Sequence, residues 1–249
     1  MNRLFERLFL LMIFISFQSC AQIEAKDGGN VEEDVTRDYE IPPENIYPAS
    51  DVIISTHNDW TKNHYPKRIH EFKQNPLQTG DIVFLGNSIT EQGEDWGLKV
   101  NNVKAKNRGI AGDTTEGVLE RLEELIYYKP AKVFLLIGIN DLFRDDMSAQ
   151  KVYDNIISIV RRINFNNPGT QIYLHTILPT TTSALKSKIK QTNSLLINAE
   201  KNESYKLILL HEEFSNENDA MNMSLSSDGV HLNDNGYEVW VKKIKEHIN

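Results

Sequence analysis

The chain is poor in cysteine: its single thiol, Cys20, cannot form an internal disulfide. Cysteine and histidine nowhere cluster in the way that holds zinc, so we expect no metal and no cofactor. No apolar run approaches the roughly 20 residues that a permanent transmembrane helix needs. With 249 residues, 40% of them hydrophobic, the chain can nevertheless bury a sizeable core without such support.

Positive charge is also scarce, because 27 Lys and Arg residues face 35 Asp and Glu residues, giving a formal net charge of −8. Residues 1–19 contribute +1 through Arg3, Arg7 and Glu6, so the remainder carries −9. Such an acidic body repels phosphate backbones and anionic lipid surfaces. We therefore expect no nucleic-acid partner, and no membrane contact except through a lipid anchor.

The first residues have the order of a bacterial export signal. Arg3 and Arg7 precede the apolar stretch 8–17, and small residues follow it. We predict a signal peptide at 1–19 and a protein exported to the cell envelope, in the periplasm or lipid-anchored to a membrane, with soluble secretion as the alternative.

The cleavage site has two interpretations. Phe17-Gln18-Ser19-Cys20 resembles a lipoprotein signal, in which Cys20 would be lipidated after cleavage. The small residues around Cys20 also suit ordinary signal peptidase. We favour the lipoprotein, because an unpaired cysteine at this position has no other evident use.

Residues 20–45 are acidic, contain a Gly-Gly and a Pro-Pro pair, and have no apolar period, which is typical of a flexible linker. We therefore place the folded domain at 46–249. There, short apolar runs alternate with amphipathic segments. Strands are predicted at 81–86, 103–108, 131–138, 171–176 and 206–210, and helices at 59–73, 113–127, 149–165, 184–201 and 233–248.

Strands separated by long helices indicate a parallel sheet that is covered on both faces. We predict an α/β fold, a three-layer α/β/α sandwich with a central five-stranded parallel sheet. In the first predicted helix, Trp60, Ile69 and Phe72 are expected to be buried. Ligands of such sheets bind at the carboxyl ends of the strands, so the loops there are the places to look for chemistry.

Two of these loops carry a serine and a glycine. Ser88 follows the strand 81–86, where its hydroxyl would be exposed and its amide could face an anion, although a turn or helix-cap serine would look the same. Gly112 follows the strand 103–108 and precedes a helix, so its amide would be free and unobstructed. We expect the adjacent Asp113 to cap that helix.

Two further loops carry an asparagine and an Asp–His pair. Asn140 follows the strand 131–138 and offers a neutral amide donor, the kind of group that stabilises an oxyanion. Asp228 precedes His231 by three residues, so its carboxylate can turn back to the imidazole and fix its tautomer. Each feature alone also occurs in ordinary turns, but all four occur here in a regular order.

This order resembles the SGNH hydrolase superfamily, also called GDSL-like. The matching blocks are GNSIT at 86–90, NRGIAGDTTEG at 107–117, GIND at 138–141 and DGVHLNDNGY at 228–237, and the resemblance covers about 47–249. The sequence is similar in particular to the bacterial group that is related to platelet-activating-factor acetylhydrolase catalytic subunits and to carbohydrate acetylesterases.

The resemblance implies a flavodoxin-like fold and a serine esterase. Ser88 matches the family's nucleophile, and Asp228 and His231 match the acid and base. The backbone amides of Ser88 and Gly112 and the side chain of Asn140 match its oxyanion hole. Asn87 departs from the usual motif, which has aspartate there, but that residue is not the acid of the triad, so we expect activity to survive.

Five other histidines could be mistaken for functional residues. His57, His64 and His70 share a helix face poorly, so we expect all three on the surface. His175 and His211 each end a predicted strand and could approach the pocket. Gly86-Asn87-Ser88 also lacks the lysine of a phosphate-binding P-loop.

Within the esterase interpretation, the short body favours a small acyl group, such as an O-acetyl group on a carbohydrate, over a lysophospholipid or thioester. A non-catalytic carbohydrate- or lipid-binding protein on the same scaffold is the second hypothesis, but Ser88, Asp228 and His231 are all intact. A flavodoxin-like binding module would explain the strand–helix rhythm without explaining these side chains.

Overall fold

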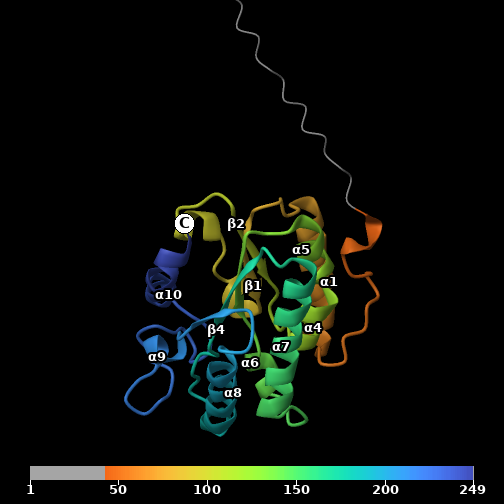
Figure 1. Ribbon diagram of the computed structural model, residues 1–249. Coiled ribbons are helices and arrows are strands. Elements are labelled where there is room, and N and C mark those ends of the chain that lie inside the picture. The colour runs from red at the N-terminus through yellow and green to blue at the C-terminus, as the bar shows by residue number, and fades with distance from the viewer. Residues whose placement is uncertain (1–42, 249) are drawn as a thin grey trace, which may run out of the picture. The chain divides into compact units, whose positions relative to one another are not determined.

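The computed structural model describes residues 43–248 (Figure 1). The predicted signal peptide at 1–19, the predicted lipidation of Cys20 and nearly all of the predicted linker at 20–45 lie outside these residues. None of the described helices is long and apolar enough to cross a membrane.

The centre of the fold is a parallel sheet of five strands in the order β2-β1-β3-β4-β5. The strands are β1 (Ile82–Gly86), β2 (Ala105–Gly109), β3 (Lys132–Leu136), β4 (Gln171–His175) and β5 (Lys206–Ile208). Their predicted number, order along the chain and parallel direction are confirmed. Because β1 lies between β2 and β3, the loops after these three strands are neighbours in space.

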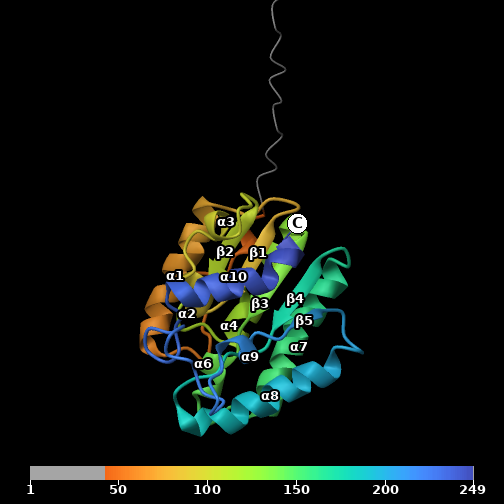
Figure 2. The same cartoon turned by 90° about the vertical axis from the view of Figure 1, so that its left-hand side faces the viewer.

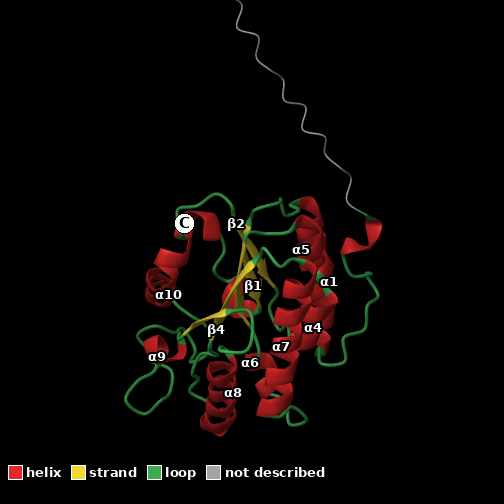
Figure 3. Ribbon diagram, viewed as in Figure 1, coloured by secondary structure: helices red, strands yellow, loops and turns green. Residues whose placement is uncertain are grey.

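Helices cover both faces of the sheet, as Figures 1 and 3 show. One face carries α1 (Asp59–Gln74), α4 (Thr115–Glu120), α5 (Glu123–Tyr128) and α7 (Ala149–Asn166), and the opposite face carries α10 (Asp234–Ile248). In Figure 2, α10 crosses in front of the sheet, and α8 (Lys186–Ala199) lies at its lower edge, packed against α7. The predicted three-layer sandwich is confirmed.

Several short elements were not predicted from the sequence. They are the helices α2 (Ser88–Glu91), α3 (Trp96–Lys99), α6 (Ile139–Leu142) and α9 (His211–Phe214), and the 3-10 turns η1 (Glu44–Ile46) and η2 (Ser183–Leu185). A helix of one turn is too short to show an apolar period. Two of them, α2 and α6, begin at or next to residues that the sequence analysis singled out.

The predicted helix 113–127 is wrong in two respects. It is split into α4 and α5, because Arg121 leaves the helical conformation between them. It is capped by Thr114, whose side chain accepts a hydrogen bond from Gly117 N, and not by Asp113. The carboxylate of Asp113 is instead turned into the protein, where it meets Arg121.

The core on the α10 side is a stack of aromatic rings. Phe84 stacks on Trp96 at a centroid distance of 3.9 Å and on Phe134 at 5.0 Å, and Trp240 meets Trp96 edge-on at 4.8 Å. Such offset and edge-to-face arrangements add to the stabilisation from buried area. They anchor β1, and with it the loop that carries Ser88, against α3 and α10.

His175 belongs to this core and does not line a pocket. Its ring is 1% exposed, and its Nδ1 lies 3.0 Å from the carbonyl of Leu135. Trp240 donates its indole N–H to Nε2 of the same ring, which fixes the tautomer with the proton on Nδ1. Burial lowers the pKa of His175 to about 4, so the ring is neutral at physiological pH.

The burial expected for α1 is only partly correct. Ile69 and Phe72 are buried as predicted, at 4% and 3% exposure. Trp60 is not, because 59% of it is exposed. Its ring stacks on that of His64, one turn further along α1, and does not enter the core.

Candidate active site

Ser88 is the first residue of α2, directly beyond the carboxyl end of β1. Asn87 caps this helix by accepting a hydrogen bond from Ile89 N, which starts the turn at the serine. The helix sits directly on the end of β2, because a Cβ at Gly109 would lie only 2.1 Å from the backbone nitrogen of Glu91. Ser88 is thereby held in a fixed and largely buried position, at 7% exposure.

The structure brings Ser88 together with the Asp–His pair 140 or more residues later in the chain. The Oγ of Ser88 lies 2.9 Å from Nε2 of His231, and Nδ1 of His231 lies 2.7 Å from Oδ2 of Asp228. An ionised carboxylate only accepts hydrogen bonds, so the ring proton is on Nδ1 and the lone pair of Nε2 faces the serine. This arrangement lets the imidazole take a proton from the serine hydroxyl.

The carboxylate of Asp228 is stabilised in its ionised form. Its other oxygen, Oδ1, accepts hydrogen bonds from the backbone N–H groups of Val230 at 2.9 Å and His231 at 2.8 Å. Burial by itself raises the pKa of Asp228, but these hydrogen bonds and that of the His231 ring outweigh it and bring the pKa to about 2. The acid partner is therefore charged throughout the physiological range.

The three predicted oxyanion donors lie on the loops after three neighbouring strands. Within the described part of the chain, no acceptor partners the backbone N–H of Ser88 or of Gly112. The amide of Asn140 uses one hydrogen on the carbonyl of Asp113, at 2.8 Å, which fixes its orientation and leaves the second hydrogen available. The strand order places Ser88 between the other two.

Gly112 has a backbone conformation that disfavours any other residue. Its φ is +77°, and a Cβ there would lie 2.1 Å from the hydroxyl of Thr61 in the first turn of α1. The glycine therefore lets α1 approach the loop closely while its N–H stays accessible.

Asp141 ties the Asn140 loop to the Gly112 loop. Its carboxylate accepts a hydrogen bond from Thr115 Oγ1 at 2.5 Å and another from Thr115 N at 3.0 Å, at the start of α4. Burial raises the pKa of Asp141 to about 6, although the hydrogen bonds from Thr115 act in the opposite direction.

A buried charge network beneath these loops was not predicted from the sequence. The two oxygens of Asp113 bind His57 Nε2 at 2.9 Å and Arg121 Nε at 3.0 Å. Arg121 also donates to the carbonyls of Gly86 and Arg108, at the ends of β1 and β2. The network therefore fastens both strand ends to the Gly112 loop. In the sequence, its only sign is Arg121, a charged residue on the buried side of an amphipathic segment.

The surface position expected for three histidines is correct for His70 only. His57 is 5% exposed because of its bond to Asp113, and His64 is half-buried against Glu91. His211 binds Asp219 Oδ1 through Nε2 at 2.9 Å. Among residues 43–248, no three His, Cys, Asp or Glu side chains are grouped in a way that could hold a metal ion.

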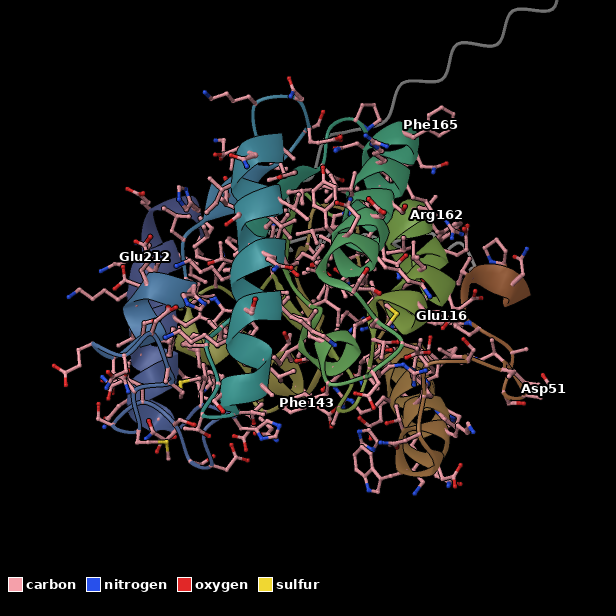
Figure 4. All side chains as sticks on the ribbon, turned by 90° about the horizontal axis from the view of Figure 1, so that it is seen from below. Asp51, Glu116, Phe143, Arg162, Phe165 and Glu212 are labelled. Carbon is pink, nitrogen blue, oxygen red and sulfur yellow. The ribbon has the colours of Figure 1, made fainter. Side chains whose placement is uncertain are left out.

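Figure 4 views the molecule from below, the end at which α6 lies in Figure 1, and labels Phe143, the residue that follows α6. The loops that carry Asn140 and Ser88 belong to this end, because both follow the carboxyl ends of strands. The site is therefore at the position that the fold favours for ligands.

Known proteins resemble this chain in sequence and in fold. Rat platelet-activating factor acetylhydrolase IB subunit alpha2 is 30% identical over 176 residues, which cover 68% of this chain and 76% of the relative. A GDSL-like lipase from Bacteroides thetaiotaomicron superposes with a TM-score of 0.64 at 24% identity, covering 73% of this chain and 96% of that one. A variant of an acetyl-xylooligosaccharide esterase from Geobacillus superposes with a TM-score of 0.57 at 19% identity, covering 70% and 96%.

The two superpositions show a shared fold. The sequence relationship goes further, because residues 84–239 match the GDSL-like Lipase/Acylhydrolase family. The predicted relationship to SGNH hydrolases is thus confirmed. The chain belongs to the GDSL-like lipase/acylhydrolase family, a family of carboxylic ester hydrolases.

Proposed function

We propose that this protein is a serine esterase that removes O-acyl groups, preferably O-acetyl groups, from carbohydrates through an acyl-enzyme at Ser88. The observation that carries the proposal is the chain of contacts from Ser88 through His231 to Asp228, at 2.9 and 2.7 Å. These are distances at which a general base acts on a nucleophile.

In the proposed mechanism, His231 takes the hydroxyl proton of Ser88 while Oγ attacks the ester carbonyl carbon. The tetrahedral oxyanion is held by the N–H groups of Ser88 and Gly112 and the amide of Asn140. His231 then protonates the leaving alcohol. In the second half, His231 deprotonates a water that attacks the acyl-enzyme, and the carboxylic acid leaves with Ser88 restored.

Two findings support acetyl as the acyl group. The curated relative is named as an acetylhydrolase, and the structural neighbour from Geobacillus is named as an esterase of acetylated xylooligosaccharides. The runner-up is hydrolysis of lipid acyl esters, as in a lysophospholipase or thioesterase. A glycan-binding protein without turnover is the remaining alternative.

The nucleophile is tested with the variant Ser88→Ala. We expect it to lose labelling by an organophosphate and nearly all hydrolysis of p-nitrophenyl acetate, because Ser88 supplies the hydroxyl that contacts Nε2 of His231, whereas Ser226 and Ser227 bond His231 only at its backbone carbonyl. Mutation of the exposed Ser194 to alanine is the control and leaves both unchanged. Wild-type hydrolysis by Ser88→Ala would overturn the assignment.

The acyl preference is tested with a panel of substrates. Acetylated sugars are compared with p-nitrophenyl esters of increasing chain length and with a lysophospholipid. We expect kcat/KM to be highest for acetyl esters. A steady increase with chain length would instead favour the lipid alternative.

We further propose that the protein is exported and lipidated at Cys20, on the basis of the signal-like residues 1–19. Expressed in a bacterium supplied with labelled palmitate, the wild type should incorporate label and remain in the membrane fraction. The Cys20→Ala variant should do neither. Unlabelled wild-type protein in the soluble fraction would contradict lipidation and favour ordinary cleavage.

A further inference from the structure

An exposed tryptophan stands in the first turn of α1. Trp60 is 59% exposed, whereas the other two tryptophans, Trp96 and Trp240, are at most 1% exposed. The indole stacks on the imidazole of His64, with a centroid distance of 4.7 Å and an interplanar angle of 24°. The stacking gives the indole a fixed orientation, so that it presents a flat aromatic surface to the solvent.

The stacked pair is fixed to the helix that carries the proposed nucleophile. Nε2 of His64 lies 3.0 Å from both carboxylate oxygens of Glu91, the last residue of α2. Glu91 also accepts the N–H of Ala111 at 2.5 Å, and Ala111 directly precedes Gly112. The ring of His64 is therefore held in place by the same carboxylate that joins α2 to the oxyanion loop.

The pair also borders the site through the backbone of α1. Thr61, the residue after Trp60, packs so closely on Gly112 that its Oγ1 lies 2.1 Å from where a glycine Cβ would be. Trp60 thus extends from a turn that contacts the proposed oxyanion hole directly. A ligand whose ester is bound at Ser88 and which extends toward α1 would meet this turn.

The surroundings of the indole favour a polar ring over an acyl chain. The other exposed residues of this part of α1 are Asp59, Lys62 and Asn63, and His64 and Glu91 lie beneath. An acyl chain needs a continuous apolar lining. A sugar ring has one face of C–H groups, which suits the electron-rich face of an indole, and hydroxyls at its edge, which suit charged and amide neighbours.

We propose that Trp60 and His64 form a subsite for the pyranose ring that bears the ester, with the sugar stacked on the indole. The inference rests on the proposed esterase function and specifies its alcohol part. Trp60 supplies the binding surface, and His64 and Glu91 position it relative to Ser88.

The proposal is tested by comparing two substrates, a mono-O-acetylated methyl xylopyranoside and glyceryl triacetate, which has no ring. For Trp60→Ala we expect the ratio of kcat/KM values, sugar over triacetate, to fall about 5- to 10-fold, mainly through a higher KM for the sugar. Trp60→Phe should retain part of the preference. His64→Ala should lower it as well, since the indole loses its support.

Phe165→Ala is the matched control. Phe165 is an aromatic residue with 87% exposure in the last turn of α7, at the end that leads into β4 and thus away from the site. Figure 4 shows it on the other side of the molecule from Phe143. The substrate ratio of this variant should equal that of the wild type.

A binding measurement gives an independent readout. Because Trp60 is the one exposed tryptophan among the three of the sequence, acrylamide quenching of tryptophan fluorescence reports on it. In the Ser88→Ala protein, the acetylated xyloside should protect against quenching, and in Ser88→Ala/Trp60→Phe it should not. Glyceryl triacetate should give no protection in either.

The outcomes separate the two proposals. If the wild type hydrolyses triacetate through Ser88 but Trp60→Ala leaves the substrate ratio unchanged and no protection is seen, the subsite is overturned and the esterase stands. If Trp60→Ala lowers hydrolysis of a lysophospholipid and not of the sugar ester, the subsite is overturned in favour of a lipid contact. If the wild type hydrolyses neither ester, the proposed function itself fails.

Discussion

At the scale of single residues, the site depends on hydrogen bonds that leave one hydrogen or one lone pair free. His231 uses Nδ1 on Asp228 and so presents the lone pair of Nε2 to Ser88. Asn140 uses one amide hydrogen on Asp113 and keeps the other. In both cases the hydrogen bond that is already made fixes the orientation of the side chain, and the atom that remains free is the one available for catalysis.

Asn140→Ala tests the amide donor. The variant should lower kcat about 10²- to 10³-fold, because one of three oxyanion donors is lost. KM should change little, since the donor acts on charge that develops in the transition state. Steady-state kinetics with an acetyl ester measures both.

Its control is Asn166→Ala, which removes an exposed amide from the last turn of α7 that bonds only the carbonyl of Arg162 in the described structure. Turnover of this control should match the wild type. Equal turnover in Asn140→Ala and the control would remove Asn140 from the proposed oxyanion hole.

At the scale of elements, the short helix α2 is held by its close approach to β2. A Cβ at Gly109 would meet three backbone atoms, the N and Cα of Glu91 and the C of Thr90, at 2.1 to 2.7 Å. Backbone cannot move aside as a flexible side chain can. The position of Ser88 therefore depends on a glycine in a neighbouring strand.

Gly109→Ala should displace α2 and with it the nucleophile. We expect a loss of about 1–3 kcal/mol in the free energy of unfolding, the usual cost of overpacking. The kcat/KM should fall as well, because the serine hydroxyl moves relative to His231. Urea unfolding and kinetics on the same preparation measure the two effects.

Gly169→Ala is the comparison variant, since a Cβ there meets nothing within 4 Å. It should retain wild-type activity and stability. If Gly109→Ala behaved like Gly169→Ala, the close packing of α2 on β2 would have no bearing on the site.

The elements also show where prediction from the sequence succeeds. All five strands were predicted to within a few residues. The signal is strong in β1 and β3, which are continuous apolar runs as expected of buried parallel strands, and weak in β2, which reads AKNRG. The helix 113–127 was predicted as one piece, because its apolar residues keep the right spacing across the break. The break follows from Arg121 bonding the carbonyls of Gly86 and Arg108, and those partners are far away in the sequence.

At the scale of the whole molecule, one buried carboxyl should influence how stability varies with pH. Burial raises the pKa of Asp141 to about 6, above its ordinary value near 3.8. Between these two pH values the carboxyl of Asp141 is ionised in the unfolded chain but still protonated in the folded protein. The contribution of Asp141 to stability therefore falls as pH rises from about 4 to 6. Above about pH 6 the cost is constant, at roughly 3 kcal/mol if the whole shift is realised.

Asp141→Asn should remove this dependence. The unfolding free energy of the wild type should therefore decrease relative to that of the variant from pH 4 to pH 6, and the difference should be constant above pH 6. Urea midpoints at pH 4, 5, 6 and 7 measure the trend.

Mutation of Asp51 to asparagine is the control, because this residue is exposed (Figure 4). The difference in unfolding free energy between this control variant and the wild type should not change between pH 4 and pH 7. A flat difference for Asp141→Asn as well would show that the carboxyl titrates as it does in the unfolded chain.

The sequence by itself determined the strands, the three-layer arrangement, and the order of serine, glycine, asparagine and the Asp–His pair, because apolar periodicity and local motifs are properties of short stretches. The tertiary structure decided that Ser88 meets His231, that His57 and Asp113 are buried with Arg121, and that Trp60 is exposed. Each of these depends on which distant segments pack together. No local pattern specifies which residue will neutralise a buried charge, or which side of a helix will remain exposed to solvent.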